Sequence, residues 1–134
     1  NEFVDALRDM LVFDAIICNT DRHYGNFGFM IDSHTNRIVA PAPLFDHGNS
    51  LFNFAGPDDL ASSRALGAYA ETLAPCVYDD FIGTARSSLA ERHHAGLRHL
   101  LTFRFKRPPR YNLPADRLML IEQEVRKRAR MLLS

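Results

Sequence analysis

The residues best suited to chemistry lie in two short segments in the first half of the chain. The first is Asp21-Arg22-His23-Tyr24-Gly25-Asn26, and the second is Phe45-Asp46-His47-Gly48. An aspartate, an asparagine five residues later and a second aspartate just before a glycine are typical of phosphoryl transfer. One carboxylate can hold an attacking hydroxyl, while the amide oxygen and the other carboxylate can hold Mg²⁺ against the phosphates of ATP.

Each of these residues has an expected role in that chemistry. We expect Asp21 to orient the substrate hydroxyl and to accept its proton, and Asn26 and Asp46 to supply oxygen ligands to Mg²⁺. Arg22 or His23 would either neutralise the transferring group or buttress the loop. Taken singly, the aspartates and the asparagine are equally typical of turns, and it is their combination that indicates function.

A transition-metal hydrolase site is an alternative for the same segments. His23, His47 and Asp46, together with Asp21, offer imidazole and carboxylate ligands. However, the chain has no HExxH motif or similar ligand spacing, which disfavours this interpretation.

The elements around the two segments are expected to bring them together. Residues 2–18 are predicted to form an amphipathic helix, and residues 27–31 and 37–40 two short strands joined by a turn at 32–36. The helical spacing is carried by Leu7, Met10, Leu11, Asp14 and Ile17. The helix would end just before Asp21, and the hairpin would return Asp46 toward Asn26.

The remainder of the chain is predicted to be mostly helical. Helices are expected over 59–73, 78–89, 90–103 and 114–133, with a proline-rich loop over 104–114. The fold class is therefore mainly α with a small β-hairpin, in a single domain over residues 1–134.

Composition supports an ordinary globular protein. Of the 134 residues, 46% are hydrophobic and 24% charged, and no apolar run approaches the roughly 20 residues that span a bilayer. Two cysteines, Cys18 and Cys76, are too few for a disulfide framework, which favours a cytoplasmic protein. The chain begins at Asn1 without a signal-peptide pattern or a methionine, as expected for a processed or excised piece.

Charge is unevenly distributed although the net charge is zero. Residues 1–97 carry 6 basic and 13 acidic side chains, whereas residues 98–134 carry 10 basic and 3 acidic ones. The basic residues of the tail, including Arg126 and Arg130, have the charge pattern of a phosphate-backbone contact. The simpler expectation is a solvated outer face that pairs with Glu122 and Glu124. Three histidines of the helix predicted over 90–103 are expected at its surface or its end: His93, His94 and His99.

The two chemical segments resemble a known family. Residues 13–28 (FDAIICNTDRHYGNFG) are similar to the catalytic loop of HipA-like serine/threonine kinases, bacterial proteins with a distant similarity to phosphatidylinositol kinases. Residues 40–51 (APAPLFDHGNSL) are similar to the metal-binding segment of that family. The resemblance implies a kinase C-lobe, with Asp21 as the catalytic aspartate and Asn26 and Asp46 as metal ligands. It also implies Mg²⁺, ATP, a protein serine or threonine as acceptor, and docking of a DNA-binding antitoxin in a toxin–antitoxin pair as a family-level partner.

The chain departs from a complete kinase in one respect. A kinase also uses a lysine and a glycine-rich loop on the nucleotide, and neither a lysine nor a glycine precedes Asp21. We therefore expect a C-lobe without its N-lobe and with little activity alone. The competing expectation is a non-catalytic module that binds a partner protein or nucleic acid through residues 104–130, direct nucleic-acid contact being the less favoured of the two.

Overall fold

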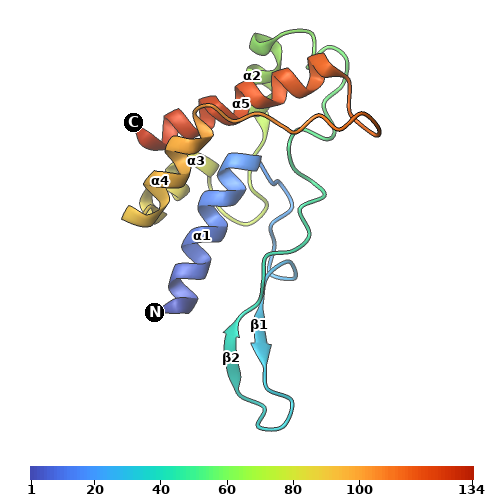
Figure 1. The fold of residues 1–134 in the computed structure, drawn as a ribbon. Helices are drawn as coiled ribbons and strands as arrows, with labels where there is room; N and C mark the ends of the chain where they lie inside the picture. Colours follow the sequence, from blue (N-terminus) through green and yellow to red (C-terminus); the bar gives the residue numbers. More distant parts are fainter.

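The computed structural model describes residues 1–134 and contains five helices and one β-hairpin (Figure 1). In chain order these are α1 (Glu2–Ile17), β1 (Phe29–Ile31), β2 (Ile38–Pro41), α2 (Ser63–Thr72), α3 (Phe81–Ser88), α4 (Glu91–Leu100) and α5 (Ala115–Leu133). The prediction of a mainly helical fold with a small hairpin is confirmed. None of the helices combines the length and the apolar character needed to cross a membrane.

Helix α1 delivers the chain to the candidate site. Asn1 caps its start, because the Phe3 backbone N–H donates to Asn1 Oδ1 over 3.0 Å. The helix ends at Cys18, which takes a left-handed conformation with φ of 53°. Met10, Asp14 and Ile17 of the expected core face are buried, whereas Leu7 is exposed. Ala15 and Ile16 extend the buried face.

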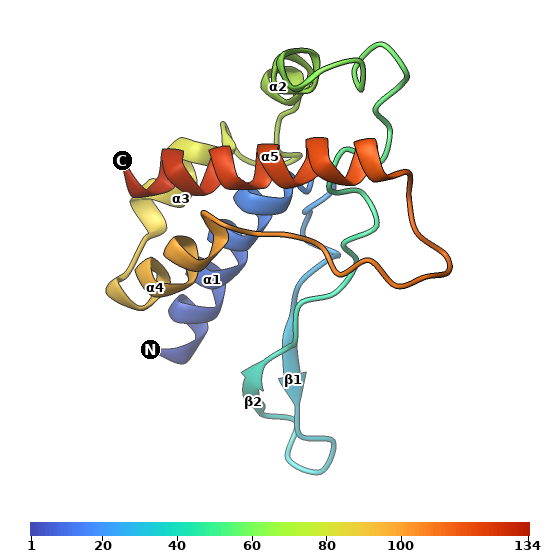
Figure 2. The ribbon, with the colours of Figure 1, turned by 45° about the horizontal axis from the view of Figure 1, so that its top comes forward.

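Helix α5 is the element against which the other helices pack (Figure 2). Its apolar stripe includes Ile121, Val125, Ala129 and Leu132, all nearly inaccessible. These side chains join those of α1, α2, α3 and α4 in one hydrophobic core. The helix predicted over 59–73 begins only at Ser63, since the Ser62 hydroxyl caps it by accepting from the Ala65 backbone N–H over 3.0 Å.

The base of the hairpin contacts α1, where the Phe3 and Phe29 rings pack edge-on with centroids 5.5 Å apart, and its turn projects away from the helices (Figure 1). Its antiparallel strands pair Phe29 with Pro41, Met30 with Ala40 and Ile31 with Ile38, with an irregularity between Met30 and Ile31. The turn is held by Asp32, whose Oδ1 accepts from the backbone N–H groups of His34 and Thr35, each over 2.8 Å. The prediction of a hairpin at this position is confirmed.

The basic tail is not a uniformly solvated face, and that expectation is wrong for its central residues. Glu122 and Glu124 are 2% and 5% exposed, and Arg128 is 6% exposed. The Arg128 guanidinium lies 5.5 Å from the Phe81 ring centroid, and its Nε donates to the Ala15 carbonyl. Arg128 therefore holds α5 to α1 and α3 and does not face a partner.

His93 is also less exposed than its neighbours on α4. Its Nδ1 accepts from the Ala90 backbone N–H over 2.8 Å, and its Nε2 lies 2.7 Å from Asp9 Oδ1 on α1. Burial alone would raise the pKa of Asp9, but hydrogen bonds from His93 and Arg92 outweigh it and lower that pKa below its usual range. His93 is at the helix end, as expected, and joins α4 to α1.

Candidate functional site

The candidate site is organised around a buried ion pair between Asp14 and Arg22. Asp14 lies on the core face of α1 and is 0% exposed, and Arg22, one residue beyond Asp21, is 1% exposed. Arg22 Nε donates to Asp14 Oδ2 over 2.8 Å, and Nη2 donates to Oδ1 over 3.1 Å. This two-pronged geometry fixes the guanidinium relative to the helix.

The same guanidinium connects the two chemical segments. Arg22 Nη1 donates to the Asn26 carbonyl and, over 3.0 Å, to the Phe45 carbonyl. Because both carbonyls share one nitrogen, the residue before Asp46 lies against the end of the first segment. The hairpin thus returns the chain as the sequence predicts. Arg22 occupies the buttressing position of its two expected roles, since four of its N–H groups are taken by protein acceptors.

Asn26 closes the first segment and keeps one oxygen available. Its Nδ2 donates to the Asp21 carbonyl over 2.7 Å, and its backbone N–H donates to the His23 carbonyl over 2.9 Å. The Oδ1 atom, opposite Nδ2 on the same amide, accepts no hydrogen bond from the protein. A neutral oxygen held in this manner suits a hard cation such as Mg²⁺.

The carboxylates of Asp21 and Asp46 have no hydrogen-bond or ion-pair partner in the protein. Asp21 is half-buried, whereas Asp46 is exposed and has a left-handed backbone with φ of 59°. The turn interpretation of Asp46 predicts that its carboxylate accepts a hydrogen bond from a backbone N–H near Gly48, and none is present. Both carboxylates therefore remain free to bind a hydroxyl or a cation.

His23 shapes the loop between Asp21 and Asn26. Its Nδ1 accepts from the Gly25 backbone N–H over 3.0 Å. A Cβ atom at Gly25 would stand 3.0 Å from the imidazole Cε1, so glycine leaves the space that the ring needs. His23 is half-buried and, like Arg22, supports the geometry of the segment.

The structure does not place His47 in a cluster of metal ligands. The His47 ring packs edge-on against Phe13, with centroids 5.3 Å apart, and its Nε2 is buried without a hydrogen-bond partner. No three side chains among the histidines, cysteines, aspartates and glutamates gather as a set of metal ligands. The transition-metal site considered from His23, His47, Asp46 and Asp21 is therefore not assembled.

Backbone bonds fasten both segments to the end of α1. The Thr20 N–H donates to the Asn49 carbonyl over 3.2 Å, and the Leu51 N–H donates to the Ile17 carbonyl over 2.7 Å. Asn19 lies between them and is 0% exposed. Its Nδ2 donates to Asp14 Oδ1 over 3.2 Å, and its Oδ1 accepts from the Asp21 backbone N–H, also over 3.2 Å.

Asp14 and Asn19 are the site residues that sequence reasoning missed. In the sequence, Asp14 stands out only as one of the positions that set the helical spacing of α1. A carboxylate on an otherwise apolar helix face is the signal that could have revealed it, because a buried charge requires a charged or hydrogen-bonding partner. Arg22 is the arginine nearest in sequence that lies beyond the helix.

Comparison with known proteins gives one informative match. Over 58 residues, which make up 43% of this chain, the sequence is 40% identical to the serine/threonine-protein kinase CtkA of Helicobacter pylori. The similarity is to a kinase. The matched stretch covers 17% of that protein, so the chain spans only a small part of its relative's length. No family model matches the chain, and no solved structure matches it. The match supports a kinase-like relation and no finer assignment.

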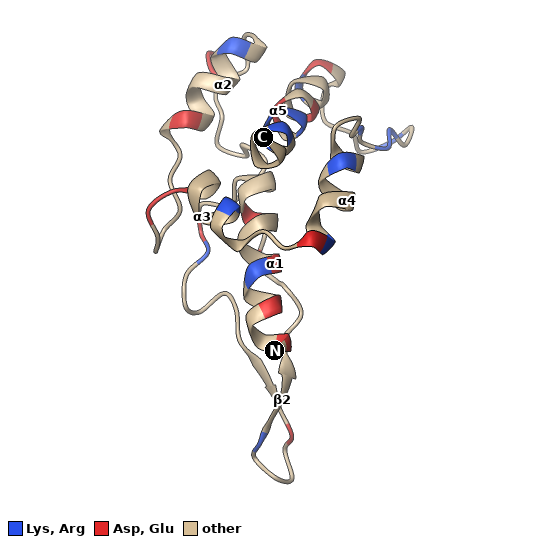
Figure 3. Cartoon of the chain, turned by 90° about the vertical axis from the view of Figure 1, so that its left-hand side faces the viewer, with Lys and Arg blue, Asp and Glu red and all other residues tan.

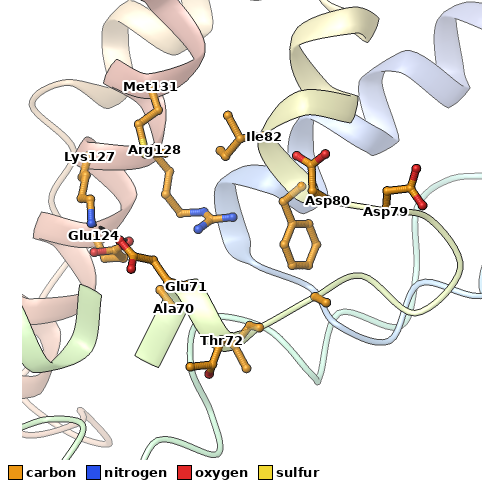
Figure 4. Close-up of a pocket in the computed structure, with 13 residues that line it drawn as sticks. Ala70, Glu71, Thr72, Asp79, Asp80, Ile82, Glu124, Lys127, Arg128 and Met131 are labelled. Carbon is orange, nitrogen blue, oxygen red and sulfur yellow. Dashed lines mark ion pairs between the residues drawn. The ribbon is translucent and has the colours of Figure 1, made fainter. Parts of the chain in front are cut away.

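A mixed-charge cavity lies elsewhere in the molecule and contains none of the expected site residues. It has a volume of about 290 Å³ and is bounded by the end of α2, the start of α3 and α5 (Figure 4). Lys127 and Glu124 on its wall pair across 3.9 Å, and Asp80 caps α3 by accepting from the Gly83 N–H. These three charged groups thus have structural partners, and we assign the cavity no function.

Proposed function

We propose that this chain carries the catalytic loop and the metal-binding segment of a HipA-like serine/threonine kinase. The observation that supports it most directly is the Arg22 guanidinium, which ties the segment of Asp21 and Asn26 to the segment of Asp46. The partial identity to CtkA, a serine/threonine kinase, points in the same direction. The lobe type and the family are part of this proposal.

The site offers two oxygen ligands for Mg²⁺ and one carboxylate for the substrate hydroxyl. Asn26 Oδ1 and the Asp46 carboxylate would hold Mg²⁺, which supplies charge neutralisation on the phosphates of ATP. Asp21 would orient the serine or threonine hydroxyl and accept its proton. Because its carboxylate has no protein partner, Asp21 needs no bond to be broken before it binds the hydroxyl.

The buried groups have a positioning role in this proposal. Phosphoryl transfer depends mainly on placing charges correctly, since the protein does little covalent chemistry. Asp14 and Arg22 fix the backbone on both sides of the reacting groups, and Asn19 fixes the Asp21 amide. Neither a lysine nor a glycine precedes Asp21, so we expect these 134 residues alone to turn over ATP poorly.

The metal site can be tested without turnover. We would add Mn²⁺·ATP to the ¹⁵N-labelled chain and record which backbone amide signals the paramagnetic ion broadens. Broadening should centre on the amides near Asn26 and Asp46, and Asp46→Asn should remove it. Asparagine tolerates a left-handed backbone, so this variant keeps the fold. Asp58→Asn is the matched control, because Asp58 is an exposed carboxylate outside the site.

Two results would contradict the proposal. Equal broadening in the chain and in Asp46→Asn would show that the ion binds elsewhere. Broadening confined to the acidic residues of the α2–α3 connection would have the same meaning. Separately, a radiolabelled-ATP assay in which the 134 residues give rapid turnover that Asp21→Ala abolishes would overturn the expectation of poor activity.

A further inference from the structure

The loop between α4 and α5 carries a group of basic side chains that the phosphoryl-transfer site does not use (Figure 3). Arg104, Lys106, Arg107 and Arg110 are all exposed residues of this loop. Arg107 forms an ion pair, because its Nη1 lies 2.8 Å from the buried Glu122 carboxylate. Lys106 has no hydrogen-bond or ion-pair partner in the protein. The loop therefore presents uncompensated positive charge.

The start of the loop is held in place by α5. The Phe105 backbone N–H donates to Glu122 Oε1 over 2.9 Å, and Arg126 Nε donates to the Phe103 carbonyl over 2.9 Å. The Phe103 and Phe105 rings also pack edge-on, with centroids 4.9 Å apart. Lys106 thus extends from a fixed segment of backbone.

A cavity of about 520 Å³ lies beneath this loop. Its apolar lining comes from Leu51 and from the loop and α5 residues Phe105, Leu113, Leu118 and Ile121. Lys106 and Arg117 are its only charged lining residues, and both are positive. The size and the mixture of apolar surface with a few polar groups are those of a ligand-binding cavity.

Arg117 has unused hydrogen-bonding capacity in this cavity. Its Nη2 makes a long 3.4 Å bond to the Phe52 carbonyl, and its Nε is buried without a partner. A buried N–H group without a partner is unfavourable, and an incoming acceptor would relieve that cost. A carboxylate, like a phosphate, can accept two parallel hydrogen bonds from a guanidinium.

The cavity adjoins the segment that contains Asp46. Ser50 and Asn53 line it, and both bond to the turn just after that residue. The Ser50 hydroxyl donates to the His47 carbonyl, and Asn53 Nδ2 donates to the Gly48 carbonyl over 3.0 Å. A ligand in the cavity would therefore lie next to the candidate metal-binding segment.

We propose that this cavity recognises an acidic, partly apolar segment of the protein that receives the phosphate. Lys106 and Arg117 would pair with its carboxylates, and the wall formed by Leu51, Leu118 and Ile121 would take an apolar side chain. That the bound segment belongs to the phosphorylated substrate rests on the proposed kinase function. That the cavity binds an acidic peptide does not depend on that function.

A peptide fits these observations better than a nucleic acid. A nucleic-acid backbone is bound by a row of cations that follow successive phosphates. Here two cations stand over a concave surface that is largely apolar. Such a surface favours a chain with both carboxylates and aliphatic side chains, which a phosphate backbone does not provide.

The test is a binding titration without nucleotide or metal. The probe is a short fluorescein-labelled peptide in which a serine is flanked by aspartates and leucines, and binding is followed by fluorescence anisotropy. The control peptide has asparagine in place of each aspartate. We expect the acidic peptide to bind more tightly and Lys106→Glu to weaken it about tenfold, since opposite charges across an interface are replaced by like ones. Arg117→Gln should also weaken it.

Arg98→Glu is the matched control for Lys106→Glu. Arg98 is an exposed residue of α4 with no ion pair, and it does not line the cavity. The same change of charge at Arg98 should leave the affinity within about twofold of the parent chain, because only screened long-range effects remain.

Three outcomes would overturn the proposal: equal binding of the two peptides, equal losses in Lys106→Glu and Arg98→Glu, or tighter binding of single-stranded DNA than of the acidic peptide. The kinase proposal fails separately. If peptide binding is found but Mn²⁺·ATP does not reach Asp46, the cavity stands as a binding site and the kinase function fails. If Mn²⁺·ATP binds and the acidic peptide does not, only the cavity proposal fails.

Discussion

The Arg22 guanidinium and the Asp14 carboxylate face each other across 2.8 Å in the interior of the protein, with 1% and 0% of the two residues exposed. Burying two charges costs free energy that their attraction recovers only when the geometry is good and the remaining donors are satisfied. Both conditions hold here, because Arg22 also bonds the carbonyls of Asn26 and Phe45. The pair therefore positions two segments as well as neutralising itself.

Removing one partner of this pair should be strongly destabilising. We predict that Arg22→Ala lowers the free energy of unfolding by about 3–5 kcal/mol, because Asp14 is left as a buried, unpaired charge. Urea denaturation followed by circular dichroism measures the change. A loss under about 1 kcal/mol, the size expected of an exposed pair, would mean that the pair is solvated.

A double variant separates stability from positioning. Asp14→Leu combined with Arg22→Met removes both charges and should restore most of the stability, since buried pairs are often replaceable by apolar residues. The same variant should still fail to bring Mn²⁺·ATP to Asp46, because the bonds from Arg22 to the Asn26 and Phe45 carbonyls are lost. Recovery of both properties would show that Arg22 has no positioning role.

The pattern of apolar residues predicted the elements well and the polar interior poorly. The start of α1, the hairpin and α5 follow from spacing, capping and turn chemistry, which are local properties of the chain. Arg128, Glu122 and Glu124 were expected in solvent, because charged residues are seldom buried. Their burial depends on partners distant in sequence, such as Ala15 and Phe105, which no local pattern reveals.

The candidate site shows the same division. The types and spacing of Asp21, Asn26 and Asp46 indicate the chemistry, since oxygen ligands and turn residues leave a local signature. The role of Arg22 could not be fixed from sequence, because its neighbours allowed either contact with a phosphate or support of the loop. Only the fold shows that Asp14 lies within reach of its guanidinium.

Acid should weaken the attachment of the α4–α5 loop through Glu122. Burial alone would raise the pKa of Glu122, but hydrogen bonds from Arg107 and the Phe105 N–H outweigh it and hold that pKa below its usual range. A lowered folded pKa gives stability that is complete above the unfolded value and is lost as the pH falls through the folded one.

We therefore predict that the contribution of Glu122 is complete above the pKa of an unfolded glutamate, about 4.5, and is lost progressively as the pH falls below it. Urea midpoints measured across this range should fall more steeply for the parent chain than for Glu122→Gln. The control is Glu91→Gln, because the Glu91 side chain is 95% exposed. Parallel profiles for all three proteins would contradict the prediction.

The two cysteines should differ sharply in reactivity. Cys18 is 1% exposed at the end of α1, whereas Cys76 is exposed. Burial raises the pKa of Cys18, and the nearby Arg128 offsets only part of that increase. A disulfide reagent that releases a coloured thiolate should react with one thiol in the native chain and with the second only after urea is added. Cys76→Ser should make the native chain unreactive; a fast reaction that persists in this variant would show that Cys18 is accessible.

The hairpin should be the most hydrophobic part of the surface. Ile31 and Ile38 face each other across the strands and are 57% and 56% exposed, with Met30 and Val39 exposed beside them. Contiguous apolar surface of this kind binds hydrophobic dyes and promotes aggregation. We predict that Ile31→Thr with Ile38→Thr lowers the fluorescence of a bound naphthalene-sulfonate dye and raises solubility. Threonine retains the preference for strands, so the free energy of unfolding should change by less than about 1 kcal/mol.

The same substitution in the core provides the control for the hairpin variant. Ile121 is 2% exposed on α5, so Ile121→Thr places a hydroxyl among apolar side chains. That change should cost more than about 1 kcal/mol of unfolding free energy and increase dye binding, because it loosens the core. If the hairpin variant were as destabilised as Ile121→Thr, the turn end of the hairpin around Ile31 and Ile38 would be packed against the helices. Their exposed side chains would then have to be buried in solution, contrary to the arrangement in which the hairpin projects from the helical body.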